Sequence, residues 1–176
     1  DPVAGDVAVS AGRITEVGRI TAGLGPAGEE IDANGAVLSP GFIDTHAHDD
    51  GAFIRYPGME FKLAQGVTSV VSGNCGFSAI PADPQQDSVA ASGGILAGLT
   101  GEFTDLDGYF STVMAAGPAI NNMMLVGHNT VRTLVMGAAK GPPNQTQMAA
   151  MKDHVRRALE QGACGFSTGL IYRPGR

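Results

Sequence analysis

The sequence contains no tryptophan and only two cysteines among its 176 residues. Two cysteines cannot build the disulfide framework of a small secreted protein, so a reducing compartment, the cytoplasm, is expected. Basic residues are also few, 11 against 17 acidic ones, for a formal net charge of −6. That balance disfavours nucleic-acid binding, which depends on Lys and Arg neutralising phosphates. No apolar run reaches the roughly 18 residues that cross a bilayer, so no membrane partner is expected.

Residues 1–38 predict a partial small β element made of short strands joined by turns. Val7 and Val9 alternate with polar neighbours, and Ile14 and Val17 lie in a second run of the same kind. The element has too few apolar residues for a core of its own, so it is expected to lean on another part of the protein.

Residues 39–176 alternate between predicted strands and predicted helices, the pattern of an α/β fold with a parallel sheet. Thr104 and Asn144 are the expected N-caps of two of the helices. Residues 76–103 predict a long irregular insertion. The four strands are expected at Phe42–His46, Val67–Ser72, Ala119–Val126 and Cys164–Ile171.

Two histidines follow the first of these strands, in the segment GFIDTHAHDD. Side chains two residues apart on a strand point to the same face, so His46 and His48 are expected to project together at its carboxyl end. Asp44 lies on that face one step deeper, where it could orient a ligand. A lone His-x-His pair is usually surface or core histidine. Its place after an apolar strand opened by Pro-Gly favours a metal site.

Cys75 stands at the carboxyl end of the second strand, with Gly73 and Gly76 close on either side. In a parallel β/α barrel these strand ends share one mouth, where active sites lie, so Cys75 is expected beside the two histidines. A thiolate is a good ligand for Zn²⁺. A cysteine is also a small buried hydrophobe, but the flanking glycines favour the ligand interpretation. We expect the three ligating atoms within roughly 4–8 Å of one another around one or two ions.

Four segments carry a resemblance to a known family: PGFIDTHAHDD, VVSGNCGFS, LVGHNTVR and GFSTGLIYRPG. In order and spacing they resemble the D-aminoacylase branch of the metal-dependent amidohydrolase superfamily, over essentially the whole chain. The His-x-His motif alone marks only the superfamily. The cysteine segment and the STGLIY strand are much more specific to the branch.

The resemblance implies the first half, about four βα units, of a TIM-type (β/α)₈ barrel over residues 39–176. Residues 1–38 would then be part of the family's small β-sandwich element. It also implies hydrolysis of the amide bond of small-molecule N-acyl-D-amino acids by a zinc-activated water. Cys75 would be a zinc ligand, and His46 and His48 would complete the superfamily's other metal position.

By the same resemblance, the chain is expected to be an incomplete and inactive piece of the enzyme. Two more metal-binding histidines and the catalytic aspartate, the general base, are expected beyond Arg176. A half-barrel also has two open strand edges, through which self-association is expected.

Four further residues are candidates for supporting roles. Tyr172 and Arg173 follow the fourth strand and are candidate substrate-binding residues. The resemblance places the tyrosine near the substrate, and the arginine could hold a carboxylate bidentately or be a loop charge. His128, at the end of the third strand, is expected to support the site or to be a hydrogen-bonded core histidine rather than to react. Asp50 could hydrogen-bond the histidines or shape their loop.

Two alternatives stay open at this point. A cyclic amidase of the dihydroorotase or hydantoinase type typically uses a bridging carboxylated lysine and lacks the cysteine on the second strand. The chain has only Lys62, Lys140 and Lys152, none of them placed at a strand end. The other alternative is a non-catalytic fragment that binds metal or serves in assembly.

Overall fold

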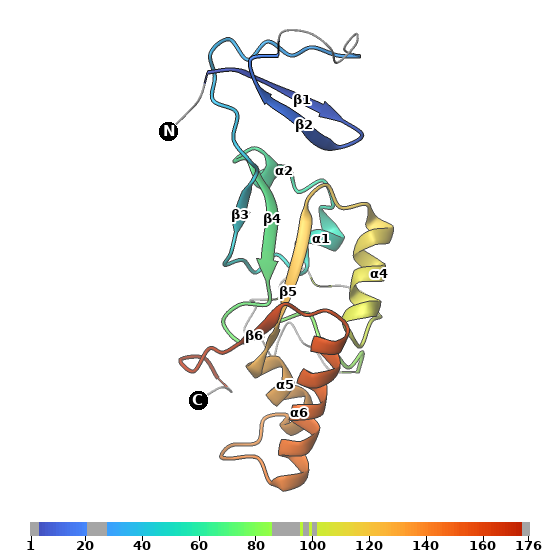
Figure 1. Ribbon diagram of the computed structural model, residues 1–176. Helices are drawn as coiled ribbons and strands as arrows, with labels where there is room; N and C mark the ends of the chain where they lie inside the picture. Colours follow the sequence, from blue (N-terminus) through green and yellow to red (C-terminus); the bar gives the residue numbers. More distant parts are fainter. Residues whose placement is uncertain (1–3, 21–27, 86–95, 97–98, 100–101, 174–176) are drawn as a thin grey trace. The chain divides into compact units, whose positions relative to one another are not determined.

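The computed structural model shows two compact units, Asp1–Pro40 and Gly41–Arg176, which are described separately (Figure 1). No helix in the described part of the chain is long and apolar enough to cross a membrane. The middle of the predicted insertion, with its Gly93-Gly94 pair, lies outside the described residues. The structure describes residues 4–20, 28–85, 96, 99 and 102–173.

The first unit contains a β-hairpin. Strand β1 (Asp6–Ser10) pairs antiparallel with β2 (Arg13–Gly18). The turn between them consists of Ala11 and Gly12, both with positive φ. Val9, Ile14 and Val17 are each about two-thirds exposed (65–68%), so the hairpin buries little apolar surface within its own unit.

The second unit is built on a four-stranded parallel sheet in the order β3-β4-β5-β6. The fold is therefore α/β, and the carboxyl ends of all four strands lie at one edge. Two strands are shorter than the sequence predicted, because β3 ends two residues before His46 and β6 ends four residues before Ile171. The strands are β3 (Phe42–Asp44), β4 (Val67–Ser72), β5 (Asn121–Gly127) and β6 (Gly165–Ser167).

Five helices connect or flank these strands in the described residues, and two of them, at residues 52–55 and 128–136, were not predicted. The sequence analysis placed His128 at the end of a strand, whereas β5 ends at Gly127 and His128 begins a helix. The carbonyl of Gly76 accepts the amide protons of Asn129 and Thr130 and so anchors its first turn. The helices are α1 (Ala52–Arg55), α2 (Glu60–Leu63), α4 (Leu106–Ala116), α5 (His128–Met136) and α6 (Gln145–Glu160).

The hydrophobic core of this unit is shared between the sheet and the helices. The hydroxyl of Tyr109, on α4, donates to the backbone oxygen of Asp50 at 2.9 Å and so ties α4 to the segment that carries the histidines. The largest fully buried side chains include Tyr109, Phe53, Met59, Val70, Met124 and Val126.

The sequence predicted the N-cap correctly for one of the two longest helices and incorrectly for the other. Asn144 caps α6 through a capping box, in which its side chain and that of Gln147 each accept the other's backbone amide. The predicted cap of α4, Thr104, is wrong by one residue. Asp105 is the N-cap, and its carboxylate accepts the amide of Gly108 at 3.0 Å. The ionised carboxylate of Asp105, beside the positive end of the helix dipole, is a stronger acceptor than the neutral hydroxyl of Thr104.

The α4 cap yields a stability prediction. Asp105→Ala should lower the free energy of unfolding by about 1 kcal/mol, because the amide of Gly108 loses its acceptor. Thr104→Ala is the matched control and should leave the unfolding free energy within about 0.5 kcal/mol of the wild-type value. Urea unfolding followed by circular dichroism measures both; equal losses in the two variants would contradict the assignment.

Candidate metal centre

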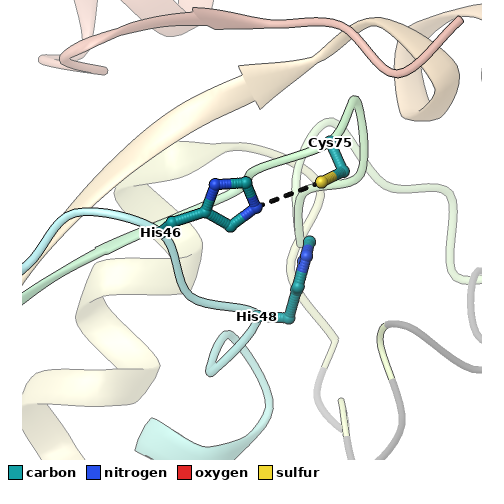
Figure 2. Close-up of side chains that lie close together, drawn as sticks. All are labelled: His46, His48 and Cys75. Atoms are coloured by element: carbon teal, nitrogen blue, oxygen red, sulfur yellow. Dashed lines mark hydrogen bonds between the residues drawn. The ribbon is translucent and has the colours of Figure 1, made fainter.

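His46, His48 and Cys75 lie together at the carboxyl edge of the sheet (Figure 2). One potential ligand atom from each residue lies within 4.8 Å of the other two. The Nε2 atom of His46 is 3.2 Å from the Sγ atom of Cys75. The predicted convergence of the three side chains is confirmed, although the distance between His46 and Cys75 is shorter than expected.

The histidines reach this position from a loop and not from a strand. Both lie beyond Asp44, the last residue of β3, so strand alternation does not explain their shared direction. Instead, the amide of Ala47 donates to the carbonyl of Val71 on β4. The side-chain amide of Asn74 donates to Val71 at 2.8 Å and contacts the carbonyl of Ala47 at 3.4 Å. The histidine loop is therefore fastened to β4 and to the turn that carries Cys75.

Cys75 occupies a left-handed backbone conformation, with φ of 55°. This conformation is uncommon for a residue with a Cβ and requires support from its surroundings. The hydroxyl of Ser167, at the end of β6, accepts the amide of Gly76 at 3.0 Å and donates to the carbonyl of Gly73. One side chain thus bridges both ends of the turn and holds the thiol at the sheet edge.

The chemistry of the three side chains fits a metal ion such as Zn²⁺. Burial and the neighbouring His46 hold the pKa of His48 below its usual value, which favours the neutral, ligating imidazole. The Nδ1 atom of His48 is buried and has no hydrogen-bond partner in the described structure. Two imidazoles and a thiol match three of the four positions of a tetrahedral zinc site.

The two aspartates expected to support the histidines contact backbone groups. Asp44 accepts the backbone amide of His46 at 3.1 Å, and its hydrogen bond with Lys62 holds its pKa below the usual value. Asp50 is fully buried and accepts the amide of Ala79 at 2.8 Å. Burial raises the pKa of Asp50 to about 6. Asp50 therefore joins the histidine loop to the segment after Cys75.

The remaining candidates lie around this centre without joining the group of three. His128 is half-buried at the start of α5, with its ring 6.2 Å from that of Phe166. The ring of Tyr172 packs edge-on against Phe77 at 5.8 Å. Arg173 is exposed. These three positions remain predictions as supporting and substrate-binding residues.

The sequence analysis assigned no role to three residues that shape the centre. Lys62 lies on α2 and pairs with Asp44 and Asp49, although its place away from a strand end gave it no role in the sequence analysis. Asn74 contacts the histidine loop at Ala47, and Ser167 bonds the turn over residues 73–76. Only the tertiary structure shows what they hold.

Comparison with known families settles the relationship of the chain. The pattern described as "Amidohydrolase family" matches residues 29–173. The chain belongs to the amidohydrolase family.

Curated relatives of this amidohydrolase include three proteins of Alcaligenes xylosoxydans xylosoxydans. An N-acyl-D-glutamate deacylase is 44% identical over 97% of the chain, an N-acyl-D-aspartate deacylase is 37% identical over 97%, and a D-aminoacylase is 35% identical over 96%. The chain spans about a third (34%) of the length of each of these relatives.

Solved structures show the same relationship. The N-acyl-D-glutamate deacylase from Bordetella bronchiseptica, in complex with zinc and a phosphonate inhibitor that mimics the tetrahedral intermediate, superposes with a TM-score of 0.84 at 44% identity. A D-aminoacylase with a binuclear metal centre superposes with a TM-score of 0.82 at 37% identity. Each match covers 96% of this chain and 35% of the other.

The support of the Cys75 turn yields a prediction at Gly169. A Cβ added at Gly169 would lie 1.9 Å from the carbonyl oxygen of Cys75, so Gly169→Ala must displace one of the two segments. We expect a loss of about 1–3 kcal/mol in unfolding free energy, the usual cost of overpacking. In Gly165→Ala, the matched control, the new Cβ meets only the end of the Leu125 side chain at 3.1 Å. Urea unfolding of both variants tests the contact, and equal stability would contradict it.

Proposed function

We propose that this amidohydrolase contributes a zinc site and half of a TIM-type barrel to an enzyme that hydrolyses N-acyl-D-amino acids. The observation that carries the proposal is the group of two imidazoles and one thiol within 4.8 Å. It occurs in a chain that is 44% identical to an N-acyl-D-glutamate deacylase. His46, His48 and Cys75 would hold the metal.

Each group in the site then has a distinct task. When bound, zinc supplies a Lewis acid for water and for the amide carbonyl. Arg173, exposed beyond β6, would bind the carboxylate of the substrate through charge-assisted hydrogen bonds. Tyr172 would line the substrate side, with its ring held by Phe77.

The described carboxylates closest to the histidines are either paired with Lys62 or fully buried, which disfavours each of them as the general base. Asp44 bonds His46 and Lys62, Asp49 pairs with Lys62, and Asp50 is fully buried against Ala79. A base must reach the reacting proton within hydrogen-bond distance. The resemblance implies instead that an aspartate beyond Arg176 is the base.

The cyclic amidase alternative is less well supported by these contacts. It would need a lysine free to be carboxylated at a strand end, and Lys62 is the lysine nearest to the histidines in sequence. Its amine lies 2.7 Å and 2.8 Å from two carboxylates, which keep it protonated. A carboxylated Lys62 would place a third negative charge between those two carboxylates.

Zinc binding by the chain itself is the direct test of the site. Without the two further histidines that the resemblance implies, the ligand shell is incomplete, so we expect weak binding that a chelator removes. Cys75→Ala should abolish the binding that remains, whereas Cys164→Ala, at an exposed cysteine, should not change it. Competition with a chromogenic chelator measures all three proteins; zinc that survives prolonged dialysis against chelator would mean an additional ligand.

The proposed activity is tested separately, with N-acetyl-D-glutamate and N-acetyl-D-methionine as substrates in the presence of Zn²⁺. A protein that carries these residues at the full length of the relatives should hydrolyse at least one of them. The 176-residue chain alone should be slower by at least about 10²–10⁴-fold, the usual contribution of a general base. Comparable turnover by both would show that the chain assembles a complete site, and absence of turnover by both would overturn the proposed substrate class.

A further inference from the structure

Lys62 connects the two ends of the loop that carries the histidines. Its Nζ atom lies 2.7 Å from Oδ2 of Asp44 and 2.8 Å from Oδ2 of Asp49. Asp44 precedes His46 by two residues, and Asp49 follows His48 directly. One cation on α2 therefore spans the whole His-x-His segment.

Each of the two carboxylates belongs to a residue that anchors the loop. The Oδ1 atom of Asp44 accepts the backbone amide of His46 at 3.1 Å, so the position of this carboxylate affects the position of the His46 backbone. The backbone oxygen of Asp49 accepts the amides of Ala52 and Phe53 and so connects the second histidine to the start of α1. Movement at either carboxylate would be transmitted to the adjacent histidine.

The Lys62 cluster differs from an ordinary surface ion pair, which contributes little to stability. The lysine side chain is only 18% exposed, and the aspartates are 30% and 18% exposed. Burial alone would lower the pKa of Lys62, but the two ion pairs raise it above its usual value. Without the ammonium group, two partly buried carboxylates would face each other and repel.

We propose that Lys62 is a positioning residue, which holds His46 and His48 in the geometry that binds the metal. The inference rests on the metal site proposed above and extends it to a residue outside the ligand set. Lys62 acts through Asp44 and Asp49, and it does not contact the metal or the substrate.

The proposal predicts that loss of Lys62 changes zinc affinity in the opposite direction from a simple charge effect. Removal of a nearby positive charge should by itself strengthen the binding of a divalent cation. Removal of a positioning residue should weaken that binding, because the histidines lose their alignment and the ordering of the loop must then occur on binding. The sign of the change in zinc affinity therefore distinguishes the two roles.

The experiment compares Lys62→Met with Lys62→Arg and with Lys152→Met, a control at an exposed lysine on α6. Zinc affinity is measured by chelator competition, and the Co²⁺ form provides the cobalt–thiolate absorption of Cys75. We expect Lys62→Met to bind zinc about 10–100-fold more weakly, the usual effect of losing a residue that orients ligands, and to change the cobalt spectrum. Lys62→Arg should restore most of the affinity, and Lys152→Met should match the wild type.

A second measurement needs no metal. Hydrogen exchange of the backbone amide of His46 should be about tenfold faster or more in Lys62→Met than in the wild-type chain, because its acceptor Asp44 is released. Unchanged exchange would overturn the inference, as would unchanged or tighter zinc binding by Lys62→Met. Failure of the wild-type chain to bind any zinc would instead overturn the proposed metal site, and the exchange experiment would still decide the role of Lys62.

Discussion

Parallel pairing of β3 with β4, and of β4 with β5, sets the positions from which the rest of this centre is built. In a parallel sheet the carboxyl ends of successive strands lie at one edge, and the loops that leave them are neighbours whatever their separation in sequence. His46 and Cys75 are 29 residues apart in the chain, yet their side chains are 3.2 Å apart. The sheet brings the loops together, and hydrogen bonds between the loops then determine where each side chain points.

These hydrogen bonds form two linked sets. Around the histidines, Lys62 and its two carboxylates hold the ends of the loop, and Asn74 contacts its middle. Around the thiol, Ser167 bridges the ends of the turn. Asn74 belongs to that turn and also contacts the histidine loop. The same residue therefore helps to position both the thiol and the histidines. Such a preorganised arrangement reduces the ordering that a metal would otherwise impose on binding.

The sequence predicted the features that depend on local pattern. The strand at Val67–Ser72 and the N-cap at Asn144 were placed correctly, and the adjacency of parallel strands predicted that Cys75 lies beside the histidines. It did not predict α5, whose residues Val131 and Thr133 are poor helix formers, because that helix is anchored by a carbonyl more than 50 residues away. The contributions of Lys62 and Ser167 were missed for the same reason, since their partners are close only after folding.

The close approach of Gly169 to Cys75 has a consequence for the redesign of this protein. The Cys75 carbonyl and the backbone of Gly169 leave no room for a Cβ, and the carbonyl of Gly169 accepts the amide of Tyr172. The turn over residues 73–76 and the segment 167–172 therefore behave as one module. A graft that transfers the thiol turn to another parallel sheet must carry the second segment with it, together with the glycine at their point of contact.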